Sequence, residues 1–136
     1  MRPPQPPGRI SAAESQVMAA VWDGADAGRG GAGAEEILAA AGPANGWGEA
    51  TVRTLIRRLI GKGALASQRR RGMVVYAPLI RRQDWVTDES RGLLDRLFGG
   101  RLAALVAHFA QEQALDPDDL ARLKRLVAEL DADEDD

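Results

Sequence analysis

The sequence contains no cysteine and a single histidine, His108, among its 136 residues. Without cysteine the chain has no thiolate nucleophile, no disulfide and no thiolate metal site, so redox sensing through thiols is excluded. There is no glycine-rich phosphate loop, and the carboxylates gather toward the C-terminus rather than in a pattern that suggests a pocket. Enzymes bring nucleophiles, acid–base groups or a cofactor together at one site. The sequence therefore predicts a protein that is not an enzyme and that uses no cofactor or metal.

Long apolar runs are missing as well. A helix needs about 20 apolar residues in succession to cross a bilayer, and no segment of the chain approaches that length. Residues 1–9, MRPPQPPGR, lack the apolar stretch of a signal peptide and hold too few apolar groups to order themselves. We therefore expect a soluble, cytoplasmic protein with a disordered arm at 1–9 and no membrane insertion.

Acidic and basic residues occupy different parts of the chain, although the net charge is only −2. Residues 50–83 contain no Asp or Glu but hold nine of the 18 Lys and Arg residues. Residues 112–136 contain ten acidic residues against three basic ones, and they end in an acidic tail at 131–136. The local charge, rather than the total, sets the field that a partner meets. The two parts are therefore expected to have different partners.

Apolar periodicity and capping signals predict a mainly helical chain. Ser11 and Glu14 match a capping box, and Asp116 with Pro117 supplies an N-cap and a first helical residue. The glycine-rich segment 24–33 is expected to be a flexible connection, and Gly42-Pro43 is expected to end the second helix. The predicted helices span residues 12–23, 34–41, 49–62, 82–98, 102–113 and 117–130.

Two β-favouring runs, 66–70 and 73–77, flank a turn at Arg71-Gly72 and predict a hairpin. Three helices followed by a hairpin is the order of a winged helix-turn-helix, in which the third helix enters the major groove of DNA. We predict a mainly α fold with a small β-hairpin wing. A winged helix-turn-helix DNA-binding domain at 10–80 is followed by a C-terminal helical dimerisation domain at 81–130.

The third predicted helix has an apolar face and a basic face. Its apolar residues recur at helical spacing, and on the other face Glu49 is the one acid. The first turns of a recognition helix reach base edges, whereas contacts farther along the helix and in the wing go to phosphates. Thr51, Arg53 and Thr54 are the predicted base readers. The predicted phosphate contacts are Arg57, Arg58, Lys62, Arg69, Arg70 and Arg71.

Two apolar stripes near the C-terminus predict a homodimer. Alternation of three- and four-residue spacings is typical of helices that pack along one seam. The stripes could instead close a core within one chain. A two-fold interface is favoured, because a helix-turn-helix protein that binds a palindrome needs two copies related by two-fold symmetry. The stripes consist of Leu102, Leu105, Val106 and Phe109 in one helix, and Leu120, Leu123, Leu126, Val127 and Leu130 in the next.

Several segments resemble the penicillinase-repressor family of bacterial transcriptional repressors. They are ISAAESQVMAAVW at 10–22, WGEATVRTLIRRLIGKGAL at 47–65, VYAPL at 75–79 and ESRGLLDRLFGGRLAALVAHF at 89–109. The most specific of them are 47–65 and the run 93–98 that precedes Gly99-Gly100. The resemblance covers almost everything between residues 10 and 130.

This resemblance implies a homodimeric repressor that binds palindromic operators in double-stranded DNA. It implies DNA contacts at Gly48, Ala50, Thr51, Thr54 and Arg58, and Ala50 departs from the longer polar residue that is common at that position. In family members that respond to β-lactams, a sensor-activated protease triggers cleavage at a bond that matches His108–Phe109 here. His108 replaces an asparagine that is common in those members.

A second function remains open at this point. The basic helix could dock an acidic surface of another protein, which would make the chain a winged-helix interaction module rather than a repressor. Sequence-dependent binding to DNA is expected only of the repressor.

Overall fold

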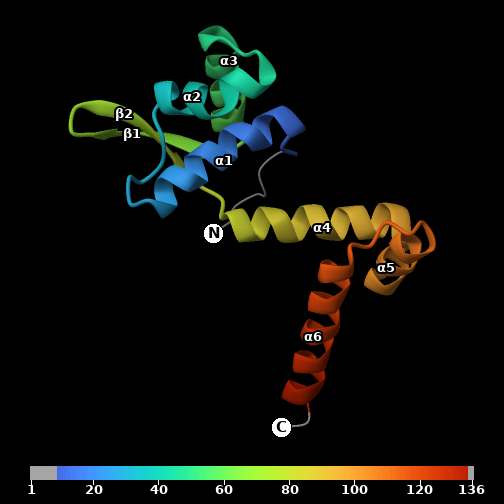
Figure 1. Cartoon of the computed structure of the whole chain (residues 1–136). Helices are drawn as coiled ribbons and strands as arrows, with labels where there is room; N and C mark the ends of the chain where they lie inside the picture. The colour runs from blue at the N-terminus through green and yellow to red at the C-terminus, as the bar shows by residue number, and fades with distance from the viewer. Residues whose placement is uncertain (1–8, 135–136) are drawn as a thin grey trace, which may run out of the picture. The chain divides into compact units, whose positions relative to one another are not determined.

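The computed structural model describes residues 9–134 (Figure 1). Residues 1–8 of the predicted arm and residues 135–136 of the predicted tail lie outside the described part. The chain divides into two compact units, of which the first ends at Thr87 and the second begins at Asp88. The boundary lies inside a helix and seven residues beyond the predicted domain boundary at residue 80.

The first unit is a winged helix-turn-helix (Figure 1). Its elements are α1 (Ala12–Asp26), α2 (Ala34–Asn45), α3 (Glu49–Gly61), β1 (Leu65–Arg70), β2 (Met73–Pro78) and the start of α4 (Arg82–Phe98). The antiparallel strands pair from Leu65 with Pro78 to Arg70 with Met73. Arg71 and Gly72 both have positive φ angles, 52° and 79°, as the tight two-residue turn of a hairpin requires. The predicted fold class and hairpin are confirmed.

The start of α1 is fixed by the predicted capping box. The Ser11 hydroxyl accepts the Glu14 amide at 3.1 Å, and the Glu14 carboxylate accepts the Ser11 amide at 2.9 Å. The helix continues to Asp26, three residues beyond the predicted end, so the interpretation of Gly24 as a helix end was wrong. Gly24 is buried against the backbone of Gly31, and a Cβ atom at this position would clash with the Gly31 carbonyl oxygen.

The glycine-rich connection also contains regular structure that the sequence did not predict. Ala32 exchanges two backbone hydrogen bonds with Tyr76, of 2.9 and 3.1 Å, and so forms an isolated antiparallel β-bridge beside β2. Gly31 has a φ of 149°, and a Cβ atom there would clash with the Tyr76 carbonyl oxygen. Gly24 and Gly31 are therefore required because other backbone segments approach them closely, and not only because glycine makes a connection flexible.

The end of α2 differs from the prediction because Pro43 lies inside the helix. A proline usually pushes the preceding residue out of helical conformation by contacting its Cβ atom. That residue here is Gly42, which has no Cβ, so the helix continues to Asn45. Gly46 then ends it in the left-handed conformation, with φ 68°.

One hydrophobic core lies between the three helices and the base of the hairpin. It is formed by Val17, Met18 and Val21 of α1, Ile37 of α2, and Val52, Leu55, Ile56 and Leu59 of α3, together with Leu65 of β1 and Trp22. The predicted apolar stripe of α3 is confirmed except for Ile60, which is 40% exposed at its edge.

The first turn of α4 packs on α1 and so belongs to the first unit. The Trp22 indole donates to the Ile80 carbonyl at 3.0 Å, and its ring lies 5.7 Å from that of Trp85. Arg82 lies over the Trp22 ring and bridges Asp23 and Asp26 at 2.6 and 3.2 Å. These contacts extend the first unit to Thr87.

The second unit contains the rest of α4, then α5 (Leu102–Gln111) and α6 (Pro117–Glu134). Gly99 and Gly100, with φ angles of 59° and 80°, end α4 as predicted. Asp116 accepts the Asp118 amide at 2.9 Å, which confirms the predicted N-cap of α6. The helix extends four residues beyond the predicted end at 130, so residues 131–134 of the acidic tail are helical.

We expect Gly31→Ala to lower the free energy of unfolding by about 3 kcal/mol, because the methyl group meets the Tyr76 carbonyl and the φ angle disfavours alanine. Gly28→Ala is the matched control, since Gly28 has a positive φ of 85° but open space around it; it should lose only about 1 kcal/mol. Urea denaturation followed by circular dichroism measures both. Equal losses of unfolding free energy in the two variants would contradict the close approach of Gly31 to the Tyr76 carbonyl.

Candidate nucleic-acid interface

The outward face of α3 is exposed because the opposite face supplies part of the core. Val52, Leu55, Ile56 and Leu59 are each at most 5% exposed. Residues on the other side of the helix point to solvent: Ala50, Thr51, Arg53, Thr54, Arg57 and Arg58 are all exposed. All of the predicted base readers therefore share one accessible surface with two of the predicted phosphate contacts.

A shallow depression of about 290 Å³ lies on this face, lined by Ala50, Thr51, Thr54, Leu55 and Arg58. Four of these residues are among the five whose DNA contacts the family resemblance implied. The fifth, Gly48, is the N-cap of α3, with an extended backbone. The Thr54 hydroxyl donates to the Ala50 carbonyl at 3.0 Å, so its oxygen still has an acceptor site free to face outward.

Arg53 has a partner on its own helix. Its guanidinium contacts the Glu49 carboxylate at 3.0 Å, and both side chains are more than half exposed. Such an exposed pair contributes about 0.5 kcal/mol or less, so it can open when a stronger acceptor approaches. Arg57 and Arg58 make no ion pair among the described residues, and they leave the last turns of α3 positively charged.

The wing carries Arg69, Arg70 and Arg71, all exposed, at the end that projects beyond the helices (Figure 1). Arg69 lies opposite Val74, and Arg70 lies opposite Met73. The Arg70 guanidinium lies against Gly30 of the α1–α2 connection. The structure thus exposes the predicted wing residues as a second basic surface on the same unit.

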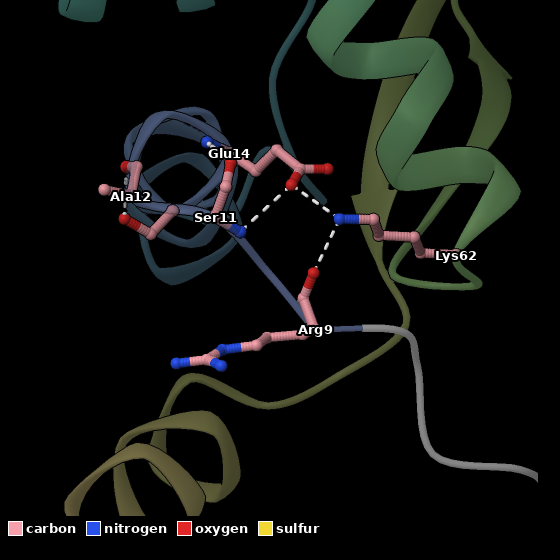
Figure 2. A network of polar contacts seen from close by, with 6 residues as sticks. Arg9, Ser11, Ala12, Glu14 and Lys62 are labelled. Atoms are coloured by element: carbon pink, nitrogen blue, oxygen red, sulfur yellow. Dashed lines mark hydrogen bonds and ion pairs between the residues drawn. The ribbon is translucent and has the colours of Figure 1, made fainter. Parts of the chain in front are cut away.

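Lys62 differs from the other predicted contacts because its ammonium group is bound within the protein (Figure 2). It donates to the Glu14 carboxylate and to the Arg9 carbonyl, both at 2.6 Å. The Glu14 side chain is 3% exposed, and that of Lys62 is 29% exposed. These contacts do not support the phosphate role predicted for Lys62, and they give it a structural role between α1 and α3.

Among the residues of this unit that the structure describes, Glu14 is the charged side chain that is buried. Burial by itself would raise the pKa of its carboxyl group, but hydrogen bonds from Lys62 and Ser11 favour the carboxylate and hold the pKa below its ordinary value of 4.5. The capping box predicted the Ser11 contact. No local pattern could predict Lys62, because the two residues are 48 positions apart in the sequence.

Arg82 was counted in the basic stretch of the sequence but is bound to Asp23 and Asp26 on α1. Of the nine basic residues in 50–83, two therefore neutralise acids of α1, and seven face solvent. The exposed seven are Arg53, Arg57, Arg58, Arg69, Arg70, Arg71 and Arg81.

The part of the chain that the structure describes holds no cluster of three His, Asp or Glu residues that could bind a metal ion. Within the same residues, no helix combines the length and the apolarity that crossing a membrane requires.

Comparisons with known proteins identify the family of this chain. The family model for the penicillinase repressor matches residues 10–129. The chain belongs to the penicillinase repressor family. This is a family of transcriptional repressors, as the resemblance in the sequence implied.

Two relatives illustrate the extent of the match. The penicillinase repressor of Bacillus licheniformis is 27% identical over 121 residues, which are 89% of this chain and 91% of that protein. The methicillin resistance regulatory protein MecI of Staphylococcus aureus is 26% identical over 118 residues, 87% of this chain and 92% of that protein. The penicillinase repressor match therefore includes both units.

A solved structure is also similar to part of the chain. It is the solution structure of the monomeric form of BlaI, the B. licheniformis repressor, in complex with the blaP half-operator. It is 30% identical and covers 59% of this chain and 90% of that chain, with a TM-score of 0.49.

We expect the Glu14–Lys62 pair to make the free energy of unfolding decrease at acidic pH. Because the folded pKa of Glu14 lies below 4.5, the carboxylate contributes stability above that pH, and this contribution is lost as the pH falls through the folded pKa. Urea denaturation between pH 7 and pH 3 should show a steeper loss in the wild type than in Glu14→Gln. The same slope in both would contradict the role of the pair.

The matched test at neutral pH removes the other partner. Lys62→Met leaves a buried carboxylate without its cation and should lower the free energy of unfolding by about 3 kcal/mol. The other lysine of the chain is the exposed Lys124, and Lys124→Met should leave stability almost unchanged.

Proposed function

We propose that this chain is a homodimeric transcriptional repressor that binds palindromic operators in double-stranded DNA. The observation that carries the proposal is the exposed, basic outward face of α3, on the same unit as a wing with three exposed arginines. No Asp or Glu interrupts residues 50–83. Membership of the penicillinase repressor family supports the same function.

In this proposal α3 enters the major groove. Thr51, Arg53 and Thr54, near its start, read base edges, because threonine can bind a base or contact a thymine methyl group and arginine can bridge two acceptors of guanine. Gly48 and Ala50 let the backbone approach the DNA. Arg57, Arg58 and the wing arginines bind phosphates, which fix the position of the protein without reading sequence.

The second unit supplies the dimer. None of its described side chains, from Asp88 to Asp133, is buried, although α5 and α6 are rich in leucine and valine. Leu102, Leu126, Val127 and Leu130 are between 48% and 65% exposed. A hollow of about 540 Å³ lies between the predicted stripes and is lined mostly by apolar side chains, among them Leu105, Val106, Phe109 and Leu123. A second copy that covers this surface would complete the missing core, and it would bring two α3 helices to two half-sites.

Release of repression is proposed to follow cleavage of the His108–Phe109 bond. The bond lies within α5, and both side chains are exposed, with Phe109 at 41%. A cut there divides the apolar stripe of α5 and so weakens the dimer. Extracts of β-lactam-challenged cells should cut the chain at this bond. Loss of DNA binding in such extracts while the chain stays intact would contradict this mode of release.

Base readers and phosphate contacts should respond differently to substitution. Thr51→Val should weaken binding to the best genomic fragment about tenfold and reduce discrimination among fragments. Arg57→Ala should weaken binding to all fragments by a similar factor, because a phosphate contact carries no sequence information. Fluorescence anisotropy measures both, with Arg91→Ala on α4 as the control. If Arg91→Ala weakened DNA binding as much as Arg57→Ala does, the assignment of the DNA-binding surface to α3 would be contradicted.

The oligomeric state tests the second unit. Leu126→Asp places a charge in the proposed interface and should convert the dimer to a monomer in sedimentation velocity, with much weaker binding to a two-half-site fragment. Ala121→Asp adds the same charge to the opposite side of α6 and should leave the dimer intact. A wild-type chain that sediments as a monomer would contradict the proposed homodimer.

A further inference from the structure

The tip of the wing exposes apolar surface among its arginines. Met73 is 69% exposed and Val74 is 45% exposed, whereas the later residues of β2 are half-buried or, at Ala77, buried. Arg69, Arg70 and Arg71 precede them across the turn. The phosphate contacts assigned to the wing use the arginines alone and leave Met73 without a role.

The hairpin holds Met73 in a defined place. It pairs with Arg70 as the last residue pair of the sheet, and the turn between them consists of Arg71 and Gly72. Both turn residues have positive φ angles, which match the twist of a tight hairpin. The Arg70 guanidinium lies against Gly30 of the α1–α2 connection, which leaves Arg71 of the turn as the free charge next to Met73 at the tip. Arg69 pairs with Val74 and therefore lies on the opposite face of the hairpin from Met73.

The surroundings of Met73 favour one kind of partner. Residues 50–83 include no acid, so the charges that the wing itself brings to the tip are all positive. The minor groove of DNA is narrow, with sugar walls between two rows of phosphates, and a narrow groove has an enhanced negative potential. Methionine is among the apolar residues that proteins insert into this groove.

We propose that the wing tip enters the minor groove beside the half-site read by α3, with Met73 as the apolar contact in the groove and Arg69 and Arg71 on the phosphates of its two rims. This inference rests on the proposed function. It gives the wing a preference for flanks without guanine, because the exocyclic N2 amine of guanine occupies the floor of the minor groove.

Base substitution in the flank tests this contact. A fragment bound by the protein is footprinted to locate the half-site, and three versions carry A·T, inosine·C or G·C pairs beside it. Inosine·C presents the major groove of G·C but lacks the N2 amine. We expect wild-type affinity to be similar for A·T and inosine·C, and about tenfold weaker for G·C.

Variants assign the effect to the side chain. Met73→Gln keeps the length of the side chain but removes its apolar end, and it should bind equally to all three flanks. Met73→Leu should retain the preference. Val74→Thr, on the opposite face of the strand, is the matched control and should also retain it. The salt dependence of binding should be the same for all four proteins, since no charge changes.

The outcomes separate the two proposals. A wild type that binds no duplex fragment preferentially overturns the proposed function. A wild type that binds preferentially but discriminates inosine·C from A·T as strongly as G·C, or a Met73→Gln variant with unchanged preference, overturns the wing assignment alone. Loss of the preference in Val74→Thr to the same extent as in Met73→Gln also overturns the assignment to Met73.

Discussion

The structure of the first unit depends on the burial of one face of α3. Val52, Leu55, Ile56 and Leu59 enter the core together, and each large apolar side chain contributes about 1.5–3 kcal/mol when it is fully buried. A rotation of the helix would expose all four. The same burial therefore fixes which residues point outward, and it presents the threonines and arginines of α3 on one surface. Stability and the proposed DNA contact thus rely on a single helical pattern.

That pattern explains why much of the candidate interface could be predicted from the sequence. The spacing of the apolar residues of α3 and the turn at Arg71-Gly72 are local signals, and the structure agrees with both. Pairings between distant residues were not predictable in this way. In the sequence, Lys62 is a basic residue on the same predicted helix as Arg57 and Arg58, and nothing local distinguishes it from them. In the fold, Glu14 lies beside Lys62 and binds its ammonium group. Gly24 and Gly31 indicated a flexible loop, whereas their missing Cβ atoms allow three backbone segments to meet.

The two units differ in whether one chain alone forms a buried core. The first buries an acidic side chain, Glu14, among apolar residues and compensates its charge with Lys62, which links the start of α1 to the end of α3. The second leaves the apolar faces of α5 and α6 exposed. Isolated helices of this length are marginal in water without tertiary packing. We therefore interpret the first unit as complete in one chain and the second as requiring a partner.

The central claim is that the basic face of α3 and the wing bind the phosphate backbone of DNA. The most direct test is the affinity of the wild type for a duplex fragment as a function of salt concentration. Each phosphate contact contributes a slope of about −0.9 to the plot of log affinity against log salt concentration. With several contacts from each subunit, the account predicts a slope steeper than about −4. A nearly flat plot would contradict it.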